Sequence, residues 1–248
     1  MQARDVKASH GWLWVKQGFA LFLKAPRQSL LISVLWTLLL GLTMFGFRSV
    51  GPIVVVLLYP ALLAGWMIAF QQIELNGAAK LSEIRLVLWK HFGALLTLGL
   101  LVLIAQVLIS IAVTLVVPLD PAVLDLAAKF PDVSEEEVTG VAANLLLFVL
   151  VQLLALLPVF AAIWFTPILL TLGKLGIVAA IRWSLYACVA DFGALTLYSA
   201  VCAIALILTA LLPLVLAIPS SLVLTPIIFG SIYASYKDIF VEDEILTV

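Results

Sequence analysis

The stretch FGALLTLGLLVLIAQVLISIAVTLVV, residues 92–117, contains no Asp, Glu, Lys, Arg or His. As an α-helix rising 1.5 Å per residue, it is long enough to cross the hydrocarbon core of a bilayer, which is about 30 Å thick. A membrane β-strand would be about ten residues long and would alternate polar with apolar side chains. The stretch therefore predicts a transmembrane helix.

Further apolar stretches of this kind lie at residues 28–47, 53–73, 141–165, 192–212 and 222–236, and the last is expected to begin nearer Val215. The composition agrees, because 65% of the residues are hydrophobic, 11% are charged and the mean hydropathy is +1.26. A soluble domain has about 25% charged residues. We predict an all-α polytopic membrane helix bundle, a single transmembrane domain over residues 1–248, with six transmembrane helices in three hairpins.

The distribution of Lys and Arg predicts the orientation. Eleven of the 13 cations precede the first span, follow the sixth, or lie between the second and third or the fourth and fifth spans. Only Arg48 and Lys129 lie in the other connections. Since cytoplasmic loops carry the excess of Lys and Arg, both termini are expected to be cytoplasmic.

A short motif recurs along the chain. IRLVLW at residues 84–89, followed by FGAL at 92–95, returns as IRWSLY at 181–186, followed by FGAL at 192–195. The N-terminal residues 12–22 have a similar aromatic and basic character. We therefore expect an internal repeat with units 1–76, 77–173 and 174–248, each an interfacial amphipathic helix followed by two spans.

The expected interfacial helices are candidates for lipid contact. In the first, Trp12, Val15, Phe19 and Phe22 have helical spacing, which predicts an apolar face in the headgroup layer. Generic anchoring and recognition of a lipid headgroup both fit this pattern, because cations near the surface are attracted to anionic lipids. The candidate headgroup contacts are Lys16, Lys24, Arg85 and Arg182.

The spans carry a candidate intramembrane polar face. Gln106 and Ser110 are four residues apart, and Asn144 and Gln152 are eight apart, so each pair lies close to one face of its helix. Polar side chains commonly hydrogen-bond across transmembrane helices, which makes interhelical contact the first interpretation. A path for a substrate is the alternative.

The sequence predicts neither a catalytic residue nor a metal or cofactor. Cys188 and Cys202 have no second metal-ligand group at a suitable spacing, and neither do His10 and His91. Asp191 directly precedes a span and is expected to satisfy the free amides of its first turn. Nucleic acid is not an expected partner; membrane lipids, another membrane protein or a second copy of the chain are.

Several short aromatic and proline motifs are similar to those of a known group of proteins. The segments QARDV (2–6), HGW (10–12), KAP (24–26) and PALLAG (60–65), with Gly18-Phe19 and Phe22, resemble a family of uncharacterised bacterial inner-membrane proteins. The layout is more remotely similar to the membrane domain attached to some glycerophosphodiester phosphodiesterases, whose catalytic domain has no counterpart here. The resemblance implies a six-span protein of a bacterial inner membrane.

The function classes that fit are few. We expect a non-enzymatic membrane protein that interacts with lipid or with another protein, because the centres of the spans carry no charge that would mark an active site or an ion path. The alternative is a transporter or translocator of a lipid or an amphiphilic small molecule, which internal repeats and proline-containing spans also favour.

Overall fold

The structure is a computed structural model that describes residues 4–47, 50–123 and 134–240. Within this part the chain is helical, without strands, and its helices are α1 (His10–Lys24), α2 (Pro26–Gly46), α3 (Gly51–Asn76), α4 (Leu81–Val116), α6 (Glu135–Trp164), α7 (Thr166–Thr171), α8 (Ile177–Ala190), α9 (Phe192–Ala210) and α10 (Leu214–Phe240). Six stretches are long and apolar enough to span a membrane: α2, α3, α4, α6 with α7, α9 and α10. The predicted all-α six-span bundle is confirmed.

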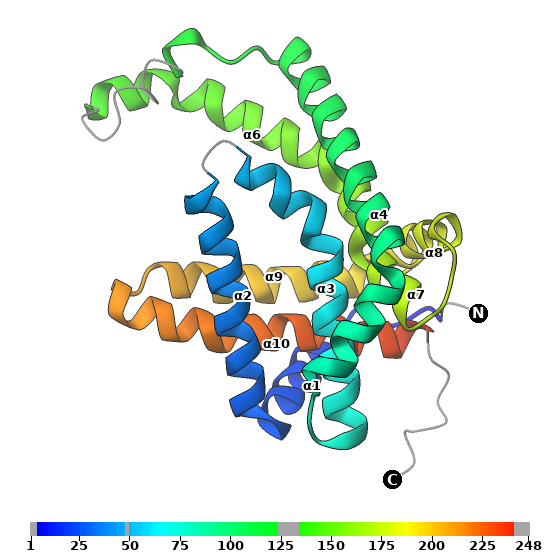
Figure 1. Cartoon of the computed structure of the whole chain (residues 1–248). Helices are drawn as coiled ribbons and strands as arrows, with labels where there is room; N and C mark the ends of the chain where they lie inside the picture. Colours follow the sequence, from blue (N-terminus) through cyan, green and yellow to red (C-terminus); the bar gives the residue numbers. More distant parts are fainter. Residues whose placement is uncertain (1–3, 48–49, 124–133, 241–248) are drawn as a thin grey trace.

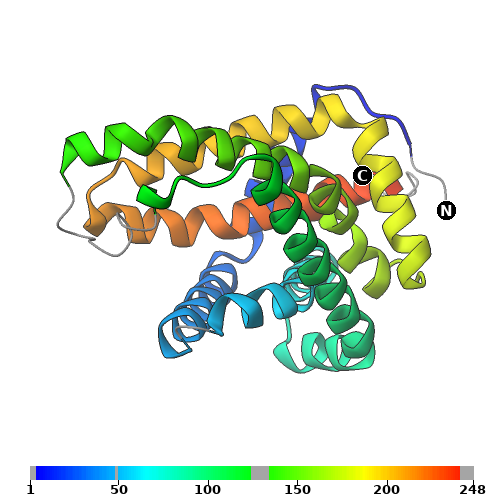
Figure 2. The same ribbon diagram turned by 90° about the horizontal axis from the view of Figure 1, so that it is seen from above.

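The spans form three antiparallel hairpins, α2–α3, α4–α6 and α9–α10, which spread apart from one end of the molecule. Figure 1 shows α9 and α10 running side by side and crossing α2 and α3 steeply, while the tip of the α4–α6 hairpin stands away from both other tips. Seen from above, the α2–α3 hairpin lies to one side of α9 and α10 (Figure 2). We call the common end, where α3 and α10 end and α4 and α9 begin, the basal end.

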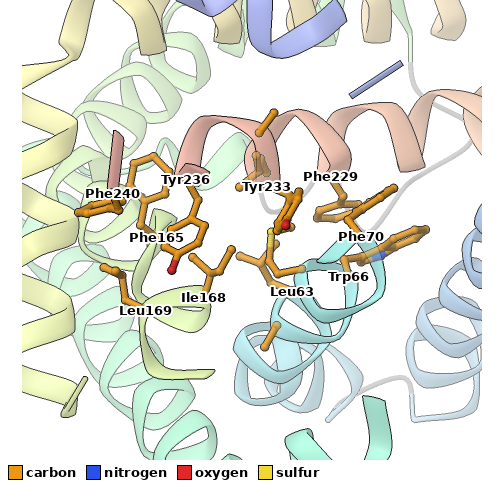
Figure 3. Packing of buried hydrophobic residues seen from close by; sticks show 14 of the residues in the cluster. Leu63, Trp66, Phe70, Phe165, Ile168, Leu169, Phe229, Tyr233, Tyr236 and Phe240 are labelled. Carbon is orange, nitrogen blue, oxygen red and sulfur yellow. The ribbon is translucent and has the colours of Figure 1, made fainter. Parts of the chain in front are cut away.

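The hydrophobic core lies toward the basal end. It joins the second half of α3, the short buried helix α7 and the second half of α10 (Figure 3). Trp66 stacks on Phe229 and on Phe70, with ring centroids 5.2 and 5.6 Å apart, and Phe165 meets Phe240 edge-on at 5.4 Å. The hairpin tips instead expose Leu, Ile and Val side chains, as spans surrounded by lipid do.

Helix α1 packs into the bundle mainly through a face other than the one expected to lie in the headgroup layer. Gly11, Trp14, Gly18 and Leu21 are buried against α9 and α10, as is Phe22, whereas Trp12 and Phe19 are exposed. Val15 is partly buried, so the prediction that Trp12 and Phe19 lie in the headgroup layer stays a prediction, and the face with the two glycines is the one that packs on the bundle. The physical reason is that small residues let two helix backbones approach closely, which hydropathy does not register.

The segments that lead into the second and third hairpins differ from each other. The segment before the second hairpin is not a separate helix, because α4 runs without a break from Leu81 to Val116. Before the third hairpin, α8 is separate from α9 and ends at Ala190, with Asp191 between the two helices. At 1.5 Å per residue, the 36 residues of α4 extend over about 54 Å, more than the hydrocarbon core requires. The sixth span begins at Leu214, as the Val215 estimate anticipated, and contains Pro219 and Pro226.

Candidate functional site

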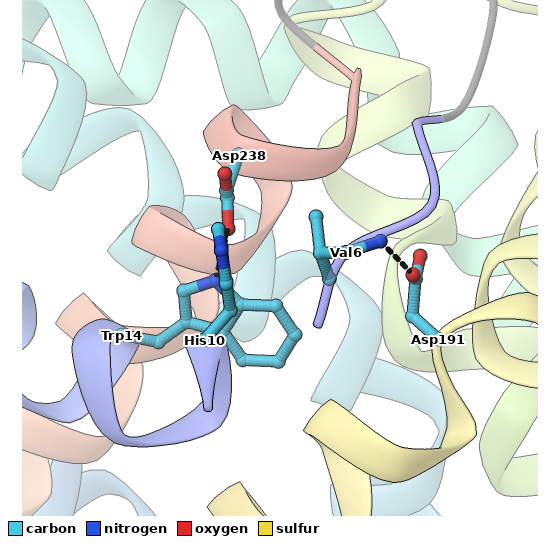
Figure 4. Close-up of polar contacts among 5 residues, drawn as sticks. All are labelled: Val6, His10, Trp14, Asp191 and Asp238. Atoms are coloured by element: carbon cyan, nitrogen blue, oxygen red, sulfur yellow. Dashed lines mark hydrogen bonds and ion pairs between the residues drawn. The ribbon is translucent and has the colours of Figure 1, made fainter. Parts of the chain in front are cut away.

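A polar cluster at the basal end fastens α1 to the last turns of α10. The His10 ring nitrogen Nδ1 lies 2.6 Å from Asp238 Oδ2, and the Trp14 indole N–H donates to the same oxygen at 2.8 Å (Figure 4). His10 and Trp14 are one turn apart on α1, so both reach a single carboxylate. His10 is thus a partner of Asp238 rather than a free interfacial residue.

Asp191, at the junction between α8 and α9, holds the N-terminal segment. Its Oδ1 accepts the backbone N–H of Val6 at 2.8 Å, and its Oδ2 is buried with no hydrogen-bond partner (Figure 4). The expectation that Asp191 caps the first turn of α9 is wrong, because its side chain makes no cap bond there. Burial raises the pKa of Asp191, and burial together with the Asp191 charge raises the pKa of the nearby Cys188 thiol to about 12.

A second polar cluster joins α3 to α10. Lys237 Nζ lies 2.6 Å from Glu74 Oε1, and the Tyr233 hydroxyl donates to Glu74 Oε2 at 2.8 Å. Lys24, at the end of α1, donates to the backbone carbonyl of Glu74 at 3.4 Å. Because Glu74 and Lys237 compensate each other at the edge of the bilayer, this cluster is a structural brace between the first and third hairpins.

The candidate intramembrane polar face is brought together in part. Gln152 of α6 donates to Ser110 Oγ of α4 at 2.9 Å, as the pairing of the two faces predicted. Gln106 lies one turn before Ser110 and is partly buried. Asn144 is elsewhere, because it donates to the Pro118 carbonyl and accepts the Asp120 N–H in the connection after α4. Ser110 and Gln152 thus make an interhelical contact, and Asn144 lies apart from it.

The candidate headgroup contacts Lys16, Lys24, Arg85 and Arg182 are all exposed, but they lie on different helices and do not converge on one ligand. Three of them share a pattern. Lys16 follows Trp12 by four residues and lies 5.8 Å from the centre of its ring. Arg85 precedes Trp89, and Arg182 precedes Tyr186, by the same spacing, which places each cation and its aromatic ring on one helix face.

The aromatic members of these pairs are exposed, at 46% for Trp12, 76% for Trp89 and 53% for Tyr186. Trp89 also stacks on Phe92, with 5.8 Å between ring centroids. Aromatic rings beside cations are typical of side chains at the membrane–water interface. We call the pairs Trp12–Lys16, Arg85–Trp89 and Arg182–Tyr186 the three interfacial pairs.

Ser184 of α8 maintains the break between α6 and α7. Its hydroxyl donates to the Ala161 carbonyl at 2.6 Å and accepts the Phe165 N–H at 3.0 Å. In an uninterrupted helix these two backbone groups would bond to each other, so the serine replaces one bond of the helical ladder. The bend lets α7 enter the core.

An open groove of about 460 Å³ lies between α9 and α10, near the hairpin tip. Its walls include Thr209 of α9 and Pro219, Ser220 and Leu224 of α10. Among the described residues no three His, Cys, Asp or Glu side chains are placed to hold a metal ion.

Sequence reasoning missed the residues that join the hairpins at the basal end, namely Glu74, Tyr233, Lys237, Asp238 and Ser184. Lys237 was counted as a flanking cation, although Tyr233 and Lys237 are four residues apart and so share a helix face. That spacing, with a lone acid at the end of the second span, was the available signal for the Glu74 cluster. No comparable local signal marks Asp238, whose partners are more than 220 residues away along the chain.

Comparison with curated proteins gives one informative relative. A protein of Burkholderia thailandensis that is named a probable inner membrane protein is 26% identical over 263 aligned residues, which cover 97% of this chain and 94% of the relative. With the six apolar helices, this supports a multi-pass inner-membrane protein. No family model matches the chain, and no solved structure does. The likeness to the phosphodiesterase-associated membrane domain stays a prediction.

Proposed function

We propose that this chain is a non-enzymatic inner-membrane protein that binds anionic lipids at its basal end through the three interfacial pairs. The observation that carries the proposal is the recurrence of one arrangement, an exposed aromatic ring four residues from an exposed cation, on α1, α4 and α8. The basal end is then the cytoplasmic one, which agrees with the excess of Lys and Arg in its connections.

The physical basis is the interface itself. An aromatic ring is stable at the level of the headgroups, and each cation near an anionic surface contributes about 1 kcal/mol of attraction. Because the pairs lie on separate helices, the protein would contact several lipids around its base rather than enclose one. A protein partner is the competing occupant of the same surfaces.

Native mass spectrometry of the protein released from its own membrane tests the proposal. The intact protein should retain anionic phospholipid, and the double variant Arg85→Ala/Arg182→Ala should lose most of it. Lys90→Ala is the matched control, because Lys90 is an exposed cation of α4 without an aromatic residue four positions away. Equal lipid retention by all three proteins would refute the proposal, and so would a stoichiometric protein partner without selective lipid.

A second candidate, a translocator of lipid or another amphiphile, is favoured by the groove between α9 and α10. Its hydroxyl-bearing wall faces a space of the size that small-molecule sites occupy. In liposomes containing the protein, a labelled phospholipid would exchange between leaflets, and Ser220→Leu would slow the exchange by filling the groove. Thr196→Leu, on the exposed surface of α9, is the control. Exchange at the rate of protein-free liposomes would exclude this candidate.

A further inference from the structure

Each hairpin is preceded along the chain by a leading segment that packs on another hairpin. The start of α4 leads into the second hairpin and packs on the first, where Ile84 contacts Ile68 and Ala69 of α3. Helix α8 leads into the third hairpin and packs on the second, where Ser184 joins α6 to α7. Both leading segments therefore contact the hairpin that precedes them in the chain.

Helix α1 leads into the first hairpin, and it packs on the third. His10 and Trp14 bond to Asp238 of α10, and Trp14 meets Tyr198 of α9 with 6.3 Å between ring centroids. The order of packing is thus cyclic: second leading segment on first hairpin, third on second, and first on third.

The sequence register supports the equivalence. When Leu21, Leu95 and Leu195 of the recurring motif are placed in register, the residues eleven positions earlier are His10, Ile84 and Ser184. These are the residues that contact the second helix of another hairpin in each case. A proline also recurs at the core: Pro60 in α3, Pro167 in α7 and Pro226 in α10 are all buried.

We infer that the chain forms a closed ring of three equivalent units, and that α1 with residues 4–9 is the clamp that closes it. The first and second units, and the second and third, are joined through the chain itself. The third and first are held by packing alone, with the clamp on α9 and α10, and with α10 on α2 and α3, where Glu74 bonds to Lys237 and Tyr233. We call the contact of the clamp with α9 and α10 the seam. The Arg4 N–H donates to the Ile239 carbonyl at 2.9 Å, so the two ends of the described part of the chain meet at this seam. The seam is the place where the ring can open.

Circular permutation tests the ring. Residues 241–248 and 1–3 would link the old ends, and new ends would be made between Gly77 and Ala78 or between Gly173 and Lys174, in the connections between units. Both permutants keep six spans and should enter the membrane and fold with an unfolding midpoint within a few degrees of the natural chain. Failure of both permutants to fold, under conditions in which the natural order folds, would overturn the inference.

Cysteine chemistry tests the clamp. A Cβ on Gly193 would lie 3.4 Å from the Ala8 Cβ, close to the separation of about 3.5–4.5 Å found in disulfides. With Cys188 and Cys202 replaced by Ala, Ala8→Cys/Gly193→Cys should form a disulfide in membranes, and Ala8→Cys/Gly41→Cys should not. Absence of the first disulfide would contradict a docked clamp.

Opening at the seam is measured by labelling Ser231→Cys, a buried position of α10 beside Gly18 of α1. His10→Ala/Asp238→Asn should raise its rate of reaction with a maleimide at least tenfold, and the Ala8–Gly193 disulfide should suppress that increase. Ser184→Ala, which weakens a different contact between units, should leave the rate unchanged. Equal acceleration by both sets of substitutions would show that the ring does not open at the seam.

Discussion

Gly18 of α1 and Gly230 of α10 face each other so closely that a Cβ on Gly230 would lie 3.2 Å from the Gly18 Cα. Gly18 is the more confined of the two, since its own Cβ would come within 2.6 Å of the Ser231 backbone nitrogen. Two helices that cross backbone to backbone in this way depend on packing rather than on hydrophobic burial, because lipid is as apolar as a leucine side chain.

We therefore expect Gly18→Ala to destabilise the protein by about 1 to 3 kcal/mol through overpacking. The measurement is the free energy of unfolding in mixed micelles. Gly41→Ala of α2 is the control, since nothing lies within 4 Å of a Cβ there and alanine is the better helix former. A Gly18→Ala variant as stable as the control would show that the backbones do not approach as described.

Asp191 gives a pH dependence of defined sign. Burial raises its pKa above the ordinary value of about 3.9, so the folded state binds more protons than the unfolded state between these two pKa values. The contribution of Asp191 is fully favourable below about pH 4 and is lost as the pH rises through its raised pKa.

Asp191→Asn should remove that loss, because an amide oxygen still accepts the Val6 N–H but does not ionise. The unfolding midpoints of the natural protein and the variant should converge near pH 4 and separate at higher pH, with the variant the more stable. Parallel profiles over that range would contradict the assignment.

Ser184→Ala should cost about 1 to 3 kcal/mol of unfolding free energy, because the Ala161 carbonyl and the Phe165 N–H are left without the hydroxyl that joins them. Thr97→Ala is the control, since the Thr97 hydroxyl is exposed and bonds within its own helix. The loss should appear in thermal unfolding of the purified protein, and an equal effect of both substitutions would argue against a special role for Ser184.

The Gln152–Ser110 bond between α6 and α4 should show a coupling energy of about 0.6 to 2 kcal/mol. A double-mutant cycle with Gln152→Leu and Ser110→Ala measures it. The same cycle with Asn144 in place of Gln152 should give no coupling, since Asn144 bonds to Pro118 and Asp120 instead. If the unfolding free energies of the first cycle are strictly additive, Gln152 and Ser110 do not interact.

Sequence patterns predicted the features that depend on whether a segment is surrounded by lipid or by water. The length and polarity of each apolar stretch decide that it spans a bilayer, and for this reason the six helices could be found without coordinates. The spacing also predicted that the polar faces of the third and fourth spans meet, because polar groups in neighbouring spans seek partners, whereas the partner of Gln152 within that face is Ser110 and came from the fold.

Contacts between distant segments could not be predicted in the same way. The buried face of α1 depends on Gly11 and Gly18, whose hydropathy is close to neutral, so the aromatic residues dominated the expected face. Asp238 and Glu74 lie near span ends, where charges are ordinary, and only the fold shows that each carries bonds to another unit. The continuity of α4 has the same origin, because the packing of its first turns on α3 extends the helix beyond the span.

The meeting of α1 with α10 has a consequence for biosynthesis. Helix α1 ends at Lys24 and its partner ends at Phe240, so at about 5 to 20 residues per second the ribosome takes roughly 10 to 40 s to make the chain between them. During that interval Trp14 lacks its hydrogen-bond partner Asp238 and Gly18 lacks the α10 backbone on which it packs, and an amphipathic helix in this condition rests on the membrane surface. Full burial of α1 therefore waits for α10, which is completed more than 200 residues later.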